Sequence, residues 1–369
     1  YPNFKNKNLV QKDLANTLKI IASEGKKGFY EGEIAEKISK EITENNGLIS
    51  KSDLKKYNPI WRDPLISNYR DTKVITMGPP SSGGLHVIQM LNILENYDLN
   101  KIGHNSSEYI NLLAEVMKYA YADRSKYLGD PDFYEVPIRK IISKEYANEI
   151  SKNIEIGKLR PAKQIHPGKF MRKESHETTH FSVVDKQGNV VSMTYTLNST
   201  FGSKVVIEGT GILMNNEMDD FSAAPGVPNQ FNLLGAEANE IAPFKRPLSS
   251  MTPTIVLKND ELFFTTGSPG GARIISAVLQ SILNIIDFNM NLEDTTLAKR
   301  IHHQWYPDIL EYEFSLDKII ENDLKKIGYK TSSKLPLTSL QTIMFADGIY
   351  YGYGDFRRVD ALASGKIYD

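Results

Sequence analysis

Three short segments of the sequence group residues that could bind charged atoms or stabilise a reaction intermediate. The segment NNEMDDF, residues 215–221, concentrates amide and carboxylate oxygens that suit a bound cation. An acidic surface turn is the simpler alternative, and the spacing is not that of a calcium-binding hand. The segment KRPLSSMTPT, residues 245–254, sets two serines before a predicted strand, where an ordinary turn is the alternative. The segment TTGSPGGARII, residues 265–275, predicts a strand, a glycine-rich turn and a helix whose first N–H groups are open to an anion or an oxyanion.

A fourth segment, ESHETTHFSVVDKQGNVVSMTYTLNSTFG at residues 174–202, predicts a β-hairpin with threonines at its open end. Because successive side chains of a strand point to opposite sides, the apolar and polar residues of this hairpin fall on two different faces. The face that we expect to be packed carries Phe181, Val183, Val191, Met193, Tyr195 and Leu197, and the other carries Thr178, His180, Thr194, Thr196 and Asn198.

The apolar pattern also predicts the register of this hairpin. Phe181 pairs with Met193 and Val183 with Val191 if the loop comprises residues 186–188, with its glycine in the left-handed conformation. The same register places Thr178 opposite Thr196. On the hairpin alone, a threonine ladder on the surface is the simpler alternative.

The elements that must position these segments follow from periodicity and from glycine and proline breaks. We expect an exposed linker at residues 151–177 and a structural turn, rather than a phosphate loop, at GPPSSGG (78–84), because the sequence lacks the Gly-Lys-Ser/Thr ending. Strands flanked by helical blocks indicate an α+β fold. The predicted helices cover residues 9–23, 31–44, 85–97, 106–128, 271–288 and 292–300, and the predicted strands cover 73–77, 179–184, 190–197, 252–257 and 261–266.

Composition narrows the protein class. The chain has 369 residues, of which 40% are hydrophobic and 24% charged, as in globular proteins with a sizeable core. The net charge of −1 does not point to nucleic acid or an anionic membrane. The absence of cysteine excludes disulfides, thiolate catalysis and cysteine metal sites, and no apolar run reaches transmembrane length. Because the chain starts at Tyr1 without a signal peptide, we expect a processed or truncated chain.

The ordered motifs PPSSGG, YADRSKYLGDPDF, TTHFSVVD, TYTLN, NNEMDDFS, PGVPN, KRPLSSMTPTIV and GSPGGARI resemble those of γ-glutamyltranspeptidases over essentially the whole chain. The resemblance implies an N-terminal-nucleophile hydrolase with an αββα four-layer sandwich, whose precursor cuts itself before a threonine. Here the cut bond would join Glu177 to Thr178. Residues 1–177 would then be the later part of the large subunit and 178–369 the small catalytic subunit, together one structural domain.

The resemblance also implies roles for individual residues. Thr178 would be the nucleophile, activated by its own α-amine once that amine is released. Thr196 would orient it, a role that the register also favours, and Phe231 would lie in a lid over the donor site at 225–245. The remaining assignments are Gly270 and Gly271 as oxyanion donors, Asn198, Glu217 and Asp220 around the donor's α-ammonium, and Ser249 and Ser250 on its α-carboxylate. Some relatives have glutamine where this chain has Glu217.

By the same resemblance the partners would be glutathione and other γ-glutamyl compounds, with amino acids or peptides as acceptors. The cleaved subunits would form a heterodimer in the periplasm or outside the cell, with no cofactor or metal. Family precursors carry an N-terminal portion, with an arginine that clamps the donor carboxylate, ahead of the position that is Tyr1 here. The alternatives are an acylase of the same fold that acts on β-lactam side chains or poly-γ-glutamate, and a non-catalytic, unprocessed chain.

Overall fold

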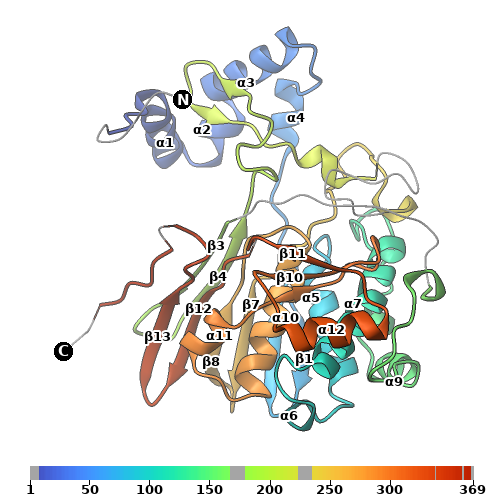
Figure 1. The fold of residues 1–369 in the computed structure, drawn as a ribbon. Coiled ribbons are helices and arrows are strands. Elements are labelled where there is room, and N and C mark those ends of the chain that lie inside the picture. Colours follow the sequence, from blue (N-terminus) through green and yellow to red (C-terminus); the bar gives the residue numbers. More distant parts are fainter. Residues whose placement is uncertain (1–7, 167–178, 223–234, 337, 360, 367–369) are drawn as a thin grey trace. The chain divides into compact units, whose positions relative to one another are not determined.

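The computed structural model describes residues 8–166, 179–222, 235–336, 338–359 and 361–366 (Figure 1). The chain divides into two compact units, residues 1–62 with 199–216 and residues 63–198 with 217–369. The expectation of one structural domain stays a prediction. The expected subunit boundary at residues 177 and 178 stays a prediction, because both residues lie outside the described ranges.

The smaller unit is mainly helical. Its helices are amphipathic, and Ile34, Ile38 and Ile207 form the centre of their apolar core. The Thr17 hydroxyl donates to the Thr210 carbonyl at 2.9 Å and joins the two chain segments of this unit. Its elements are α1 (Lys12–Glu24), α2 (Lys26–Tyr30), α3 (Gly32–Glu44), α4 (Lys51–Lys56), β5 (Val206–Ile207) and β6 (Ile212–Leu213).

The larger unit is built on an antiparallel sheet of six strands in the order β1-β2-β7-β8-β12-β13. The pair β12 and β13 was not predicted, although it extends the sheet beside β8. These strands are β1 (Leu65–Tyr69), β2 (Thr72–Thr76), β7 (Thr254–Lys258), β8 (Glu261–Thr266), β12 (Gln341–Ala346) and β13 (Ile349–Gly354).

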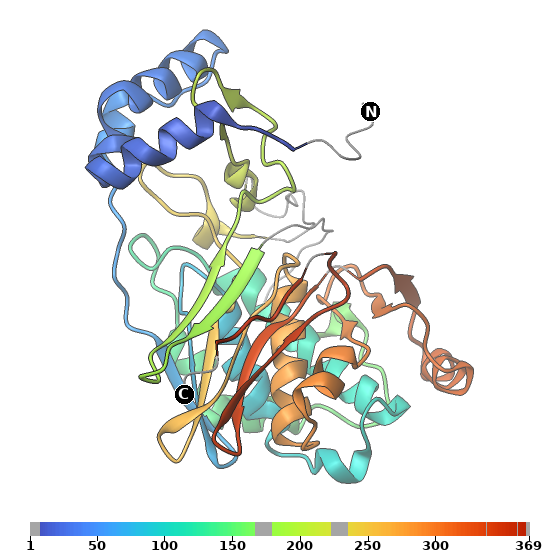
Figure 2. The ribbon, with the colours of Figure 1, turned by 90° about the vertical axis from the view of Figure 1, so that its left-hand side faces the viewer.

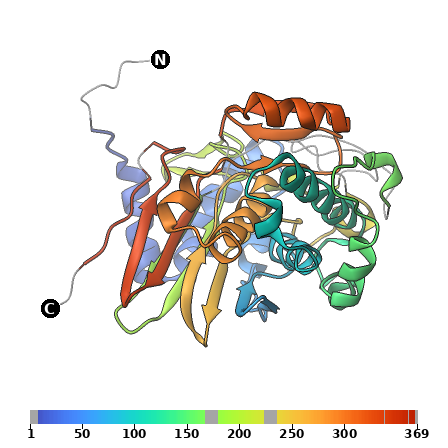
Figure 3. The same ribbon diagram turned by 60° about the horizontal axis from the view of Figure 1, so that its bottom comes forward.

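Helices cover one face of this sheet, as Figure 3 shows from below. The central ones are α5 (Gly83–Leu94), α7 (Ser107–Tyr127) and α10 (Arg273–Ile286), and their side chains form most of the core. The whole of α5 is buried, so it shows no polar face and packs on all sides. The shorter elements are α6 (Leu99–Ile102), α8 (Ile138–Ile141), α9 (Lys144–Ser151), α11 (Leu292–Leu297), α12 (Lys318–Ile327), β9 (Ile301–His302), β10 (Leu310–Glu313) and β11 (Thr331–Lys334).

The hairpin of β3 (Thr179–Val184) and β4 (Val190–Tyr195) forms a second layer beside β8 and β12 (Figure 2). Its register is the expected one, with Phe181 opposite Met193, and Gly188 in the loop has a φ of 81°. Together with the helices and the six-stranded sheet, the hairpin gives the stacked-sheet α+β architecture that the sequence predicts.

The choice of packed face was wrong. Five of the six apolar side chains of the face expected to be buried are 38–54% exposed, and the sixth, Leu197, is half-buried. The polar face lies against the large sheet instead, where the hydroxyls of Ser182 and Ser192 donate to the carbonyls of Gln341 and Thr266 at 2.9 and 3.3 Å. A polar face can pack in this way because its groups find hydrogen-bond partners on the neighbouring strands.

The expected exposed linker is only partly confirmed for its described part, residues 151–166, because most of these residues are exposed but three apolar ones are buried. Ile154, Ala162 and Ile165 are buried in the main core. Buried polar side chains of α7 bind the backbone of this segment, with Asn111 donating to the Lys158 carbonyl at 3.0 Å and Lys118 donating to the Arg160 carbonyl at 2.5 Å. The segment is therefore held to the core by three apolar side chains and by backbone hydrogen bonds, while most of its polar side chains are exposed.

Candidate active site

The hairpin end is the first part of the candidate site. The Thr196 Oγ1 accepts a hydrogen bond from the backbone N–H of Asn198 at 2.8 Å. Asn198 is buried and has a φ of 73°, a left-handed conformation that is uncommon outside glycine but that asparagine tolerates better than most residues. Thr178 and Glu177 lie outside the described residues, so the pairing of Thr178 with Thr196 stays a prediction that continues the observed register from Thr179 and Tyr195.

His180 joins this hairpin to the glycine-rich turn after β8. Its ring nitrogens lie 2.8 Å from the Thr194 Oγ1 and 3.3 Å from the Ser182 Oγ. A Cβ added at Gly267 would lie 2.1 Å from the ring, so only glycine fits there. Burial lowers the pKa of His180 to about 4, and the ring is therefore neutral at pH 7.

The glycine-rich turn is the second part. Gly270 and Gly271 precede α10 and have φ values of 132° and 57°, which favour glycine. Among the described residues, the Gly271 N–H has no hydrogen-bond acceptor. The turn is held from α7, where the Tyr121 hydroxyl donates to the Ala272 carbonyl. A helix start with an open N–H can stabilise an oxyanion.

The acidic turn is the third part, and it crowds two carboxylates together. Glu217 and Asp220 begin and end a short 3-10 helix, and their side chains share a hydrogen bond. Burial and the neighbouring charge of Glu217 raise the pKa of Asp220 well above its ordinary value, while Arg124 opposes the rise. Burial also raises the pKa of Glu217. Such a pair holds a proton until a cation arrives to stabilise both charges.

The serine pair is the fourth part. Ser249 and Ser250 lie just before β7, and Ser249 forms a parallel bridge with Ser81 of the PPSSGG segment. The Arg124 side chain on α7 donates from Nη2 to the Ser250 Oγ at 3.0 Å. The charge of Arg124 also opposes the rise in the pKa of Asp220, so the acidic turn lies within electrostatic range of this arginine.

Two residues of this arrangement escaped the sequence analysis. Arg124 lies within the quoted motif YADRSKYLGDPDF but looks like an exposed helix residue, whereas it is buried. Asn239 lies within the segment expected to form the lid, residues 225–245. It donates to the Asp220 carbonyl at 2.7 Å and accepts from the Leu248 N–H at 3.0 Å. Asn239 therefore connects the acidic turn to the residue before the serine pair. The lid residue Phe231 lies outside the described residues.

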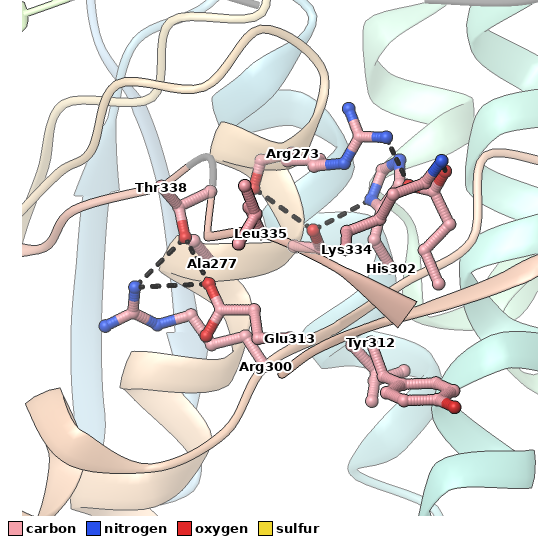
Figure 4. Close-up of a pocket in the computed structure, with 12 residues that line it drawn as sticks. Arg273, Ala277, Arg300, His302, Tyr312, Glu313, Lys334, Leu335 and Thr338 are labelled. Carbon is pink, nitrogen blue, oxygen red and sulfur yellow. Dashed lines mark hydrogen bonds and ion pairs between the residues drawn. The ribbon is translucent and has the colours of Figure 1, made fainter. Parts of the chain in front are cut away.

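A separate polar hollow lies between α10 and the β9–β11 sheet (Figure 4). Its charges are matched within the protein, since Arg273 pairs with Glu311 and Arg300 with Glu313 and Asp355. None of the predicted site residues lines it. We therefore regard this hollow as a structural network and place the candidate site at the four parts above.

Comparison with known proteins agrees with the motifs. The chain is 50% identical to the glutathione hydrolase proenzyme of Escherichia coli over 98% of this chain and 62% of that protein. It is 42% identical to the glutathione hydrolase proenzyme of a Pseudomonas species over 97% of this chain and 64% of that protein. The chain thus spans less than two thirds of the length of these relatives.

A solved structure supports the fold. The cephalosporin acylase from Bacillus halodurans superposes with a TM-score of 0.81 at 27% identity, over 94% of this chain and 61% of that one. The profile of the γ-glutamyltranspeptidase family matches residues 4–365. The resemblance inferred from the motifs is confirmed, and the chain belongs to the γ-glutamyltranspeptidase family.

Proposed function

We propose that the chain is part of a self-cleaving γ-glutamyl transferase or hydrolase that acts on glutathione and related γ-glutamyl amides. The observation that carries this proposal is the position of Arg124, which donates to Ser250 while its charge acts on Asp220. Cation-binding carboxylates and anion-binding hydroxyls thus converge on one site. This is the pattern that a free amino-acid head group requires.

The head group of a γ-glutamyl donor is a zwitterion. Glu217, Asp220 and the Asn198 side chain are oxygen-rich partners for its α-ammonium, and charge-assisted hydrogen bonds of this kind are about twice as strong as neutral ones. The Ser249 and Ser250 hydroxyls would bind its α-carboxylate. Binding of the ammonium would replace the proton that the acidic pair otherwise shares.

The reaction would proceed through an ester of Thr178. Its hydroxyl attacks the γ-carbonyl carbon, its α-amine takes the hydroxyl proton, and Gly270 and Gly271 donate to the oxyanion. Collapse of this intermediate breaks the amide bond, and the departing amine receives the proton. Water or the amine of an amino acid or peptide then attacks the ester and releases Thr178. The first cleavage, between Glu177 and Thr178, would use the same hydroxyl.

The relatives named glutathione hydrolase proenzyme support a precursor that is processed into two chains. We extend this to a large and small subunit heterodimer, with amino acids or peptides as acceptors and a periplasmic or secreted location. Among the described residues, no helix combines the length and apolar character needed to cross a membrane.

The proposal is tested on the whole protein with a denaturing gel and a γ-glutamyl anilide assay. The wild type should give two bands and release the anilide. Thr178→Ala should give one band near the full mass and no turnover, since both reactions use its hydroxyl, and Thr178→Ser should retain part of both. Two bands from the alanine variant would show that another residue is the nucleophile.

An acylase is the second candidate, favoured by the likeness to the cephalosporin acylase. The two functions differ in their need for an α-ammonium. An acyl anilide without that group should be a poor substrate for a γ-glutamyl enzyme, because the acidic pair would be left without its cation. Better turnover of this compound than of the γ-glutamyl anilide would favour the acylase. A wild type that stays uncleaved and inactive would favour a non-catalytic chain.

A further inference from the structure

The serine pair is enclosed by the PPSSGG segment. The Ser82 N–H and the Ser82 hydroxyl both donate to the Ser249 carbonyl at 2.8 Å, and the Ser249 N–H donates to the Pro80 carbonyl at 2.9 Å. A Cβ added at Gly83 would lie 2.7 Å from the carbonyl oxygen of Ser250. The glycine therefore lets the start of α5 approach the serine backbone closely, and this motif serves the serine pair rather than a phosphate.

Arg124 completes the enclosure from α7. Its Nε donates to the Ser82 Oγ at 2.8 Å and its Nη2 to the Ser250 Oγ at 3.0 Å. The side chain is buried, with a relative exposure of 3%. A guanidinium can only donate, so both serine oxygens must act as acceptors toward it.

This contact decides what the Ser250 hydroxyl can do. A hydroxyl has one hydrogen, and its oxygen accepts from Arg124, so its hydrogen must point elsewhere. Among the described residues it has no acceptor, which leaves it for a ligand. Ser249 is arranged similarly, because its Oγ accepts the Met251 N–H at 3.1 Å. In each serine, one lone pair of the hydroxyl oxygen is therefore occupied, and the hydroxyl hydrogen is left to donate to a ligand.

We propose that Arg124 is a positioning residue that holds the Ser250 hydroxyl as a donor and thereby makes the site select an α-carboxylate over an α-carboxamide. This inference rests on the proposed function. A carboxylate offers an acceptor to each serine, whereas a carboxamide turns its own N–H groups toward one of them. Specificity thus comes from the mismatch with the wrong head group as well as from attraction to the right one.

The test compares two substrates on the whole, processed protein: a γ-glutamyl anilide and the same compound with an α-carboxamide. We expect Arg124→Gln to lower the ratio of their kcat/KM values by roughly 10-fold or more, the effect of losing one hydrogen bond to a charged group. A glutamine amide can either donate or accept, so it no longer fixes the hydroxyl. In Arg124→Lys the new side chain can only donate hydrogen bonds, so this variant should keep part of the wild-type ratio of kcat/KM values.

Matched variants separate this role from a structural one. Arg139→Gln, at an exposed position on α8, should leave the ratio unchanged. Ser82→Ala removes one anchor of the guanidinium and should shift the ratio by a smaller factor. The inference would be overturned if Arg124→Gln lowered kcat/KM by the same factor for both substrates. If that variant fails to mature, an unchanged ratio in Ser82→Ala overturns it. A wild type that turns over neither substrate would instead refute the proposed function.

Discussion

The hairpin end and the acidic turn bury polar groups in opposite ways. At the hairpin end, His180 is neutral, packs on Gly267 and lies within hydrogen-bond distance of Thr194 and Ser182. At the acidic turn, two carboxylates lie side by side, and burial with mutual repulsion raises the pKa of Asp220. The polar groups of the first arrangement find partners within the protein, whereas under the proposed function the second would be stabilised by a bound cation.

This difference separates assembly from substrate binding. The hairpin end should matter for both self-cleavage and turnover, because the chain continues from it to Thr178, the predicted nucleophile. The acidic turn should matter only for turnover, since the peptide bond before Thr178 offers no α-ammonium. Two carboxylates that are crowded together in a buried turn lower the stability of the protein, and under the proposed function a bound donor would offset this loss.

The largest effect should come from Asp220→Ala. Losing one partner of a buried charge-assisted contact costs about 2–5 kcal/mol, so kcat/KM for a γ-glutamyl anilide should fall by roughly 30-fold to several thousand-fold. The two-band pattern should stay intact, and Glu217→Gln should be much milder because an amide oxygen still accepts. If kcat/KM were unchanged in Asp220→Ala, the acidic turn would not bind the donor.

The pH dependence of stability should distinguish the two regions by sign. The pKa of His180 lies below its ordinary 6.5, at about 4, so the unfolded chain binds more protons between these values. The contribution of His180 to the free energy of unfolding is therefore fully present above pH 6.5 and is lost as the pH falls toward 4. This contribution is at most about 3 kcal/mol. The raised pKa of Asp220 has the opposite sign, with a contribution that is lost as the pH rises.

Urea unfolding of the wild type and of His180→Gln at pH 4.5 and pH 7 measures how much His180 contributes to the free energy of unfolding at each pH. The variant should be less stable than the wild type at pH 7, and this gap should narrow at pH 4.5. A gap that does not change with pH would mean that His180 is not buried as a neutral group.

A steric change should weaken the hairpin end. Gly267→Ala places a methyl group against the His180 ring, and relieving such overpacking typically costs about 1–3 kcal/mol. We expect slower self-cleavage and lower turnover together, measured by the gel time course and the anilide assay. Gly365→Ala is the control, because a Cβ there meets nothing within 4 Å. If the variant lost turnover but cleaved itself at the normal rate, Gly267 would be needed for substrate binding rather than for assembly of the hairpin end.

The smallest effect should come from Thr196→Ala. It removes one orienting hydrogen bond, on the order of 1 kcal/mol or more, without unfolding the protein. Cleavage and turnover should slow by similar factors, unlike in Asp220→Ala. If only the KM for the anilide changed, Thr196 would belong with the donor pocket instead.

The sequence by itself determined much of this protein. The hairpin register and the glycine in its loop followed from alternation and turn chemistry, because a slip by one residue would invert every side chain. The order of the motifs identified the family, and the main helices before residue 300 followed from apolar spacing. The predicted roles of Thr178, Thr196 and the donor-pocket residues remain predictions.

Only the tertiary structure decided which hairpin face is packed, why Ile154, Ala162 and Ile165 are buried, and how Arg124 and Asn239 join the site. Alternation separates two faces of a strand, but the partner across the interface decides which one is buried. Arg124 and Asn239 have no local signature, since each acts through residues more than 100 and up to 19 positions away, respectively. The contacts of Arg124 arise when distant segments pack together, and those of Asn239 depend on how the chain folds back between residues 220 and 248, which periodicity does not predict.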